Sequence, residues 1–323
     1  MRKKISLFLL TLLTVYVFTF FVPRLMPGDP FSYSDFADAS DTTNLMTDAQ
    51  KKVLMAYYGL DRPLGEQFLE TLKKNLSGDF GSSIYYKKTV WDAVTDKLGW
   101  SLGLMAATLI ISLLLGVALA LAALSRKRLD AVLYGFMSVA AEIPAFLVGI
   151  ALLFLVAARL RFIPLSGGET SFAVYESLWQ RAGDVLLHAL MPVAAMVIVT
   201  TPLFYATARS CFLRIHGKRY LLTARAKGLS APRIRFYYIL LNGMAPLLAR
   251  FFLSVGACVG ATLLVENVFA YPGLGKLMRD AVQYRDYPLI QGIFLLVTLF
   301  VLTSSFVSDI ISSLVSNGGE RDI

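Results

Sequence analysis

The residues that could do chemistry in this sequence are few, and two glutamates inside apolar runs are the most informative of them. Glu142 precedes Pro144 in EIPAFLVGI, and Glu266 precedes Asn267 in LLVENVFAYPGLG. A charge in the hydrocarbon of a membrane costs about 2.5–3.5 kcal/mol unless it faces protein or water. Each glutamate could therefore line a path for a cationic or amino-terminal group, or cap or brace a helix end near a proline. Both interpretations stay open, and Glu142, Pro144, Glu266 and Asn267 are the candidates for a translocation path or gate.

Other chemistries find no support in the sequence. A phosphate loop of the form G-x-x-x-x-G-K-[ST] is absent, and GLGK at 273–276 lacks its spacing. His188 and His216 are too far apart in the chain to predict a metal pair, and Cys211 and Cys258 show no C-x-x-C spacing. No nucleophile and base stand together. The sequence therefore predicts that this chain is not an enzyme and holds no metal or cofactor of its own.

The composition is that of a membrane protein. Hydrophobic residues make up 56% of the 323, charged residues 16%, and the mean hydropathy is +0.62. A soluble chain of this size needs far more polar surface. The net charge of +9 is concentrated in short loops between apolar runs. This placement fits the inner side of a membrane better than nucleic-acid binding.

Six apolar runs are long enough to cross a bilayer. They cover residues 5–22, 100–124, 131–158, 185–208, 244–269 and 288–308, and the third is interrupted by Glu142 and Pro144. Basic residues 2–4, 126–128 and 209–235 flank them at alternate ends, which predicts that both termini are cytoplasmic. The expected fold is an all-α membrane protein with six transmembrane helices, and prolines 192 and 202 are expected to kink the fourth.

The sequence divides into three parts by composition. Residues 1–22 are expected to form an anchor helix, 23–99 a large extracytoplasmic loop, and 100–323 the transmembrane core. The hydrophilic part mixes charges of both signs, and its pattern predicts helices around Asp48–Tyr58 and Leu64–Leu76.

A basic loop at 209–243 separates the fourth and fifth predicted spans, and it contains no Asp or Glu. Tyr220–Lys227 is expected to form a short helix that ends at Gly228, because glycine accepts the left-handed conformation found just after helix ends. Pro232 suits the first turn of a second helix, with Ser230 as its cap. A helix–Gly–helix element between two spans predicts a docking site for a partner.

The segment TARAKGL, after Tyr220, resembles the cytoplasmic EAA-type loop of ABC importer permeases of the dipeptide/oligopeptide/nickel group. The general pattern has Glu where Leu222 stands and Pro where Leu241 stands, so the match is closer to this group than to the wider family. The resemblance implies a coupling helix that docks on an ATP-hydrolysing subunit. The residues that it assigns to coupling are Tyr220, Thr223, Ala224, Arg225, Ala226, Lys227, Gly228 and Leu229. Ala224 and Gly228 would allow close approach, and Arg225 and Lys227 would face the partner's acidic or backbone groups.

The pieces MPGDP, GLDRPL, SGDFGSSI and RDYPLIQG resemble other segments of this family, whereas the tail SSLVSNGGERDI departs from it. The resemblance implies a multi-pass permease of a bacterial-type inner membrane, importing short peptides. It would work with a second permease, two ATPase subunits that bind ATP and Mg, and an extracytoplasmic solute-binding protein. Two alternatives remain: a permease for nickel or another metal complex, and a secondary transporter that works alone.

Overall fold

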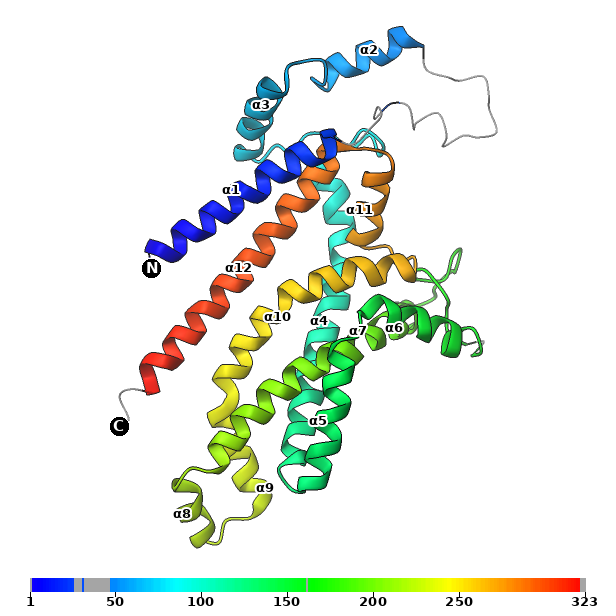
Figure 1. Cartoon of the computed structure of the whole chain (residues 1–323). Coiled ribbons are helices and arrows are strands. Elements are labelled where there is room, and N and C mark those ends of the chain that lie inside the picture. The colour runs from blue at the N-terminus through cyan, green and yellow to red at the C-terminus, as the bar shows by residue number, and fades with distance from the viewer. Residues whose placement is uncertain (1, 26–30, 32–46, 161, 320–323) are drawn as a thin grey trace. The chain divides into compact units, whose positions relative to one another are not determined.

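The computed structural model describes residues 2–25, 31, 47–160 and 162–319, and the MPGDP segment lies outside them. Helices account for most of this part of the chain (Figure 1). They are α1 (Arg2–Leu25), α2 (Asp48–Tyr57), α3 (Leu64–Leu76), α4 (Val90–Ala123), α5 (Lys127–Ala141), α6 (Ala145–Leu152), α7 (Leu178–His216), α8 (Tyr220–Ala226), α9 (Ala231–Arg233), α10 (Leu241–Val268), α11 (Leu274–Gln283) and α12 (Tyr287–Gly319). Two π-helical segments, η2 (Leu153–Ala157) and η3 (Ile234–Leu240), continue α6 and precede α10.

Five of the described helical segments are long and apolar enough to cross a membrane, and a bent pair makes a sixth if it is one span. This confirms an all-helical protein with several candidate spans. The bent pair is α5 with α6, which meet at 97°. The third span, predicted at 131–158 with an interruption at Glu142 and Pro144, is therefore sharply bent at that interruption. The reason is Pro144, which has no N–H to donate and disfavours helical backbone at Ile143 before it.

The fifth predicted span begins earlier than expected. Residues Ala231–Val268 form one continuous helical segment through α9, η3 and α10. The second helix of the predicted docking element is therefore the start of this span. Pro246 lies inside α10 and does not end it, as transmembrane helices often tolerate.

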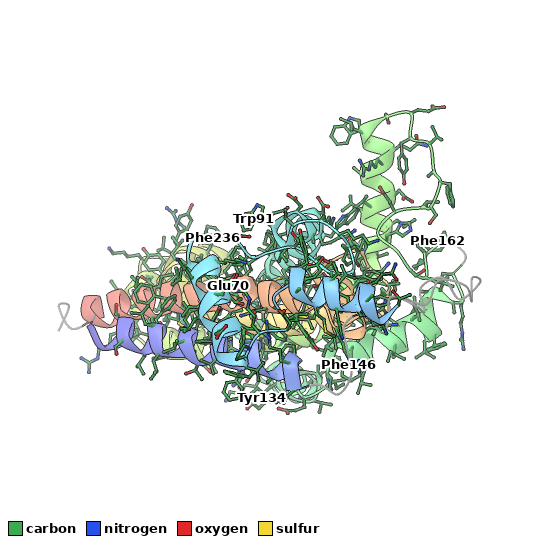
Figure 2. The ribbon with its side chains drawn as sticks, turned by 90° about the horizontal axis from the view of Figure 1, so that it is seen from above. Glu70, Trp91, Tyr134, Phe146, Phe162 and Phe236 are labelled. Atoms are coloured by element: carbon green, nitrogen blue, oxygen red, sulfur yellow. The ribbon has the colours of Figure 1, made fainter. Side chains whose placement is uncertain are left out.

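Large apolar side chains cover the outside of the helices, and no more than 39% of any candidate span window is buried within the chain. Figure 2 labels Trp91, Tyr134, Phe162 and Phe236, which are between 50% and 66% exposed. Such surfaces are normal where lipid or another membrane subunit covers them.

The described chain forms two compact units. Residues 1–99 and 276–299 make up the first, and residues 100–275 and 300–323 the second. In the first unit, Phe68 of α3 packs edge-on against Phe20 and Tyr16 of α1, with ring centroids 5.1 and 5.7 Å apart. The two helices predicted within the hydrophilic region are confirmed as α2 and α3, and Thr47 and Gln50 form a capping box at the start of α2.

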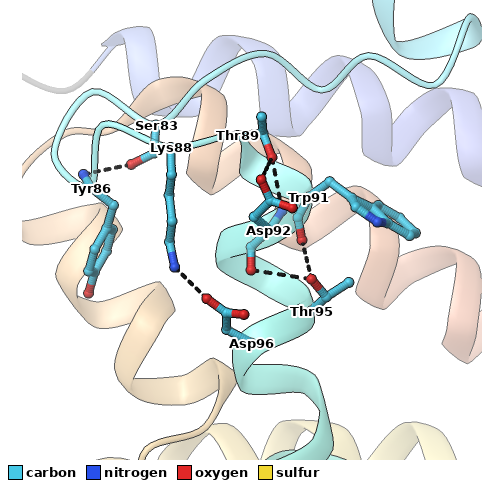
Figure 3. Close-up of polar contacts among 8 residues, drawn as sticks. All are labelled: Ser83, Tyr86, Lys88, Thr89, Trp91, Asp92, Thr95 and Asp96. Carbon is cyan, nitrogen blue, oxygen red and sulfur yellow. Dashed lines mark hydrogen bonds and ion pairs between the residues drawn. The ribbon is translucent and has the colours of Figure 1, made fainter.

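The loop before α4 is fixed by local hydrogen bonds (Figure 3). The Thr89 hydroxyl donates to the Asp92 carboxylate over 2.6 Å and accepts the Asp92 N–H over 3.1 Å. Lys88 pairs with Asp96 at 2.6 Å, and an isolated antiparallel bridge joins Ser82 to Thr89. These contacts set where α4 begins, ten residues before the predicted second span.

The core of the second unit lies where α7 packs against α5, α6 and α10. Gly116 of α4 allows a close approach to α7, since a Cβ there would lie 2.7 Å from Cβ of Phe204 and 2.8 Å from the Tyr205 nitrogen. Phe204, Tyr205 and Phe212 of α7 are fully buried. The basic loop therefore follows directly from a helix, α7, whose C-terminal half is firmly packed.

Candidate functional site

The predicted helix end at Gly228 is confirmed. Gly228 has φ +74°, its N–H donates to the Arg225 carbonyl over 2.9 Å, and the Leu229 N–H donates to the Ala224 carbonyl over 3.3 Å. These two bonds define a Schellman motif, which satisfies the last carbonyls of α8. A Cβ added at this position would meet no atom within 4 Å. Glycine is therefore required here by the backbone conformation and not by lack of space.

One face of α8 packs on its own chain. Leu221 and Ala224 are 1% and 3% exposed and belong to a cluster with Phe212, Ile234 and Ile239. Ala224 thus faces inward and is not available for the close approach by a partner that the sequence suggested. The other face is exposed and carries the remaining predicted coupling residues Tyr220, Thr223, Arg225, Ala226, Lys227 and Gly228, with Leu229 half-buried.

The exposed face of α8 is basic. Arg225 lies 3.2 Å from Nε2 of His216, and Arg235 donates to the Ser125 hydroxyl over 2.6 Å. A cavity of about 160 Å³ lies between these side chains, with Ile234 and Ile239 in its wall. No Asp or Glu occurs between positions 184 and 266. The face therefore suits an acidic or carbonyl-rich partner surface.

Besides continuing into the fifth span, the second helix after Gly228 differs from its prediction at its N-cap. Pro232 occupies the first turn of α9 as expected, and Ser230 stands at its N-cap position. The Ser230 side chain makes no capping hydrogen bond. The helix start is instead fixed by the Ile234 N–H, which donates to the Ser230 carbonyl over 3.0 Å.

Glu266 is fully buried at the end of α10, and both of its carboxylate oxygens are used inside the chain. Oε1 accepts a hydrogen bond from the Ser101 hydroxyl of α4 over 2.6 Å, and Oε2 accepts one from the Gly275 N–H over 2.5 Å. The Ser101 hydroxyl in turn accepts the Leu274 N–H over 2.8 Å. One carboxylate thus ties the end of α10 to α4 and to the turn that opens α11.

Two glycines make room for this carboxylate. A Cβ at Gly273 would collide with both oxygens of Glu266, and one at Gly275 would collide with the Leu263 carbonyl. Asn267 adds hydrogen bonds to the carbonyls of Leu263 and Gly275 over 2.8 and 3.2 Å. Ser101 and these glycines could not be found from the sequence, because only the fold brings them to the glutamate.

Glu142 and Pro144 lie at the bend between α5 and α6. Glu142 is the C-cap residue of α5, Pro144 is the N-cap residue of α6, and both are exposed. The structure does not bring them into the Glu266 cluster. They mark a sharp change of chain direction with a carboxylate on its surface.

A second buried carboxylate, Asp286, gave no signal in the sequence. It accepts hydrogen bonds from the Ser83 hydroxyl, the Tyr85 N–H (3.0 Å) and the Leu289 N–H (3.2 Å). Burial raises the pKa of Asp286 above its ordinary value, although these donors favour the anion. This aspartate anchors the loop at 83–85 to the start of α12 within the first unit.

An ion pair joins α5 to α7 in the second unit. Arg209 meets both oxygens of Asp130, at 2.5 and 2.6 Å, and its guanidinium lies 4.7 Å from the Tyr134 ring centroid. In the sequence analysis, Arg209 is one of the basic residues of the loop that predict its cytoplasmic location. The structure assigns it to helix packing, in a bidentate geometry that lysine could not reproduce.

His188 is buried, and its Nδ1 lies 2.9 Å from the Asp184 carbonyl. Among the described residues, no group of three or more His, Cys, Asp or Glu side chains could hold a metal ion. His188 therefore packs within its helix, next to a carboxylate at 3.6 Å.

The described helices define an α-helical membrane protein with five or six candidate spans and an exposed basic loop between α7 and α10. The chain belongs to the family described as the binding-protein-dependent transport system inner membrane component, which matches residues 99–318. This confirms the family resemblance predicted from the basic loop, and it confirms the membrane location.

Relatives match almost the whole chain. A putative peptide permease protein of Brucella suis is 33% identical over 96% of this chain and 94% of the relative. The di/tripeptide transport system permease protein of Pseudomonas aeruginosa is 31% identical, over 97% and 96%. The dipeptide transport system permease protein of Escherichia coli K12 is 28% identical, over 97% and 96%.

Proposed function

We propose that this chain is a permease subunit of an ATP-driven importer of short peptides. The observation that carries the proposal is the near full-length similarity to proteins named as peptide, dipeptide and di/tripeptide permeases. The described structure adds an exposed basic helix, α8, held by a Schellman motif at the end of a long apolar helix. A transporter that works alone has no need of such an element.

The proposed topology places both termini and α8 in the cytoplasm and residues 23–99 outside. The distribution of basic residues supports it, because 126–128 and 209–235 lie at the ends of apolar helices that the rule of positive cytoplasmic loops would place inside. The ATPase subunits that the proposal needs are cytoplasmic. The basic loop must therefore face them.

The proposed partners are a second permease, two ATPase subunits and an extracytoplasmic solute-binding protein. ATP and Mg would bind in the ATPase subunits, and this chain would carry no cofactor. The exposed residues Thr223, Arg225, Ala226 and Lys227 would enter a groove of one ATPase subunit. Leu221 and Ala224 of α8 share an apolar cluster with Phe212 of α7 and Leu247 of α10. A movement of α8 would therefore be transmitted to α7 and α10.

The proposed role of Glu266 is to brace the end of α10 and not to contact substrate. Both carboxylate oxygens are already engaged by Ser101 and Gly275, and the side chain is fully buried. Glu142 is exposed at the α5–α6 bend, so of the two glutamates it remains the candidate for the translocation path.

The test is transport by the purified complex in proteoliposomes. The chain is expressed with its partners, and uptake of a labelled dipeptide and tripeptide is measured with ATP, without ATP, and with a non-hydrolysable analogue. The proposal expects peptide uptake with ATP and no uptake without nucleotide or with the non-hydrolysable analogue. ATP-driven uptake of nickel in place of peptides would support the metal alternative, and uptake without nucleotide would support a secondary transporter.

The same assay distinguishes the proposed roles of Glu142 and Glu266. Glu142→Gln should lower peptide uptake while complex yield and thermal stability stay unchanged. Glu266→Gln keeps the shape but weakens two hydrogen bonds, so it should lower thermal stability first. Loss of uptake by Glu266→Gln at unchanged stability would contradict the bracing role.

A further inference from the structure

The first unit contains a polar cavity that continues into an apolar groove. The polar cavity, of about 310 Å³, is lined by Arg24, Tyr57, Tyr58, Lys74, Asp79 and Gln291 among others. The apolar groove, of about 380 Å³, is lined by Leu9, Leu13, Leu72, Leu76, Leu295 and Leu299 among others. Asn75 and Phe80 line both spaces. The two therefore adjoin and form one amphipathic site.

The polar cavity contains a cation without a carboxylate partner among the described residues. Arg24, in the last turn of α1, donates from Nε to Oε1 of Gln67 over 3.1 Å and from Nη1 to the Phe20 carbonyl over 2.9 Å. Its guanidinium lies 3.7 Å from the Phe20 ring centroid. These neutral contacts orient the group, and no carboxylate in the part of the chain that the structure describes pairs with it. A cation in a partly buried site favours an anionic ligand.

Gln291 of α12 provides a second, independent indication. It is 2% exposed, it lines the polar cavity, and its Nε2 makes no hydrogen bond of ordinary geometry in the described structure, only a weak contact with the Tyr16 hydroxyl. The nearby hydroxyl of Tyr16 accepts from Asn75 over 3.3 Å. Buried donors without an acceptor are rare and require an explanation. An oxygen of a bound anion would supply the missing acceptor.

The charges around the cavity favour an anion overall. Lys74 adds a second cation, although it also pairs with Glu70 at 3.0 Å. Asp79 is the acid in the lining, and its Oδ1 already accepts the Gly81 N–H over 2.9 Å. In the lining of this cavity, the N–H donors of Arg24, Lys74 and Gln291 that make no other hydrogen bond therefore outnumber the carboxylate oxygens that accept none.

The apolar groove decides which anion fits. A polar cavity of this volume could hold about ten waters or a small carboxylate, since each water occupies about 30 Å³. The groove continues from it along two candidate spans. Leu299 lies about 12 Å along α12 from Gln291, at 1.5 Å per residue. That length is close to half of the roughly 30 Å hydrocarbon core, which is the depth of one leaflet.

We propose that this unit binds one anionic phospholipid, with its phosphate at Arg24 and Gln291 and one acyl chain in the groove between α1, α3 and α12. This proposal depends on the membrane location of the chain and not on the identity of the transported substrate. Its position at the end of α1 and the start of α12 places the head group at a membrane surface.

The test uses the full-length chain purified with its partners, depleted of lipid in detergent, and titrated with dioleoylphosphatidylglycerol. Native mass spectrometry counts the bound lipids, and dioleoylphosphatidylcholine is the zwitterionic comparison with identical tails. We expect one tightly bound phosphatidylglycerol per chain. Arg24→Gln should weaken its binding about tenfold, as loss of a charged hydrogen bond implies.

Matched variants separate the site from general lipid contact. Lys74→Gln should weaken binding, whereas Lys73→Gln, on the same helix but outside the lining, should not. Leu296→Trp fills the groove and should release the lipid, whereas Leu10→Trp, exposed at 59% outside the lining, should leave it bound. These two pairs decide the question even if Arg24→Gln fails to fold.

Three results would overturn the proposal. They are equal affinity for the two lipids, binding that none of Arg24→Gln, Lys74→Gln and Leu296→Trp weakens, or displacement of the lipid by a dipeptide that binds the same cavity. The last would assign the cavity to a peptide carboxylate.

Discussion

Substitution of Gly228 tests the docking role of α8 most directly. Gly228 has φ +74°, and a side chain there would meet no atom within 4 Å. The cost of Gly228→Ala is therefore purely conformational, at about 1–2 kcal/mol for an L-residue in the left-handed region. Such a cost lowers the population of the capped α8 conformation about 5- to 30-fold relative to competing loop conformations.

The expected result is a graded loss of coupling. Gly228→Asn should cost less than Gly228→Ala, since Asn tolerates the left-handed region better, and Gly228→Val should cost more because its side chain is β-branched. The order of ATP-driven peptide uptake should be Gly, Asn, Ala, Val. The affinity of the ATPase subunit for the detergent-solubilised chain, measured by titration, should follow the same order.

Gly217 provides a matched control within the same loop. It has φ −83°, and an added Cβ would lie 3.8 Å from the Arg214 carbonyl, an ordinary contact. Gly217→Ala should therefore leave uptake and ATPase binding unchanged. Wild-type uptake and ATPase affinity in Gly228→Val, at normal expression, would refute the reasoning that this helix end is gripped by the partner.

Three further predictions concern orientation and the two buried carboxylates. Lys227→Cys should react with a membrane-impermeant thiol reagent only from the cytoplasmic side, and Lys52→Cys only from outside; the native thiols are buried and should add little background. Gly273→Ala would push a methyl group against Glu266 and should lower the free energy of unfolding by about 1–3 kcal/mol, read as a lower thermal midpoint. Burial raises the pKa of Asp286, so the folded chain holds this proton more tightly than the unfolded chain, and stability from this group should fall as the pH rises above about 4. Asp286→Asn should flatten that part of the pH profile of thermal unfolding, and an unchanged slope would contradict the assignment.

The features that the sequence predicted well are those decided locally. Gly228 ends α8 because glycine accepts the required φ at the lowest cost, and its motif is complete within six residues. The same holds for α2, whose capping box joins Thr47 to Gln50 three residues later. Hydropathy located the apolar helices for a similar reason, since the length of a span is set by the bilayer and not by neighbours in the fold.

The predictions that failed needed knowledge of packing. Residues 231–243 look like a separate basic helix by composition, yet they continue into α10, because Ile234 and Ile239 are buried against α7 and α8. Ala224 was expected on the outer face of α8 because it is small. It lies inside for the same reason, since only a small side chain fits between α8 and its own core.

The clusters around the buried Glu266 and the buried Asp286 show why contacts between residues far apart in the chain cannot be predicted from the sequence. Glu266 and Ser101 are 165 positions apart, and Asp286 and Ser83 are 203 apart, so no spacing rule relates them. In each cluster a carboxylate accepts hydrogen bonds from a serine hydroxyl and from backbone N–H groups at helix ends, one such N–H for Glu266 and two for Asp286. A buried acid in a membrane protein suggests a transport role, yet the Glu266 carboxylate is fully buried and bonded on both oxygens within its own chain, so a substrate cannot reach it in this conformation. This burial supports the proposed bracing role of Glu266, and it leaves exposed acids such as Glu142 as the proposed candidates for the translocation path.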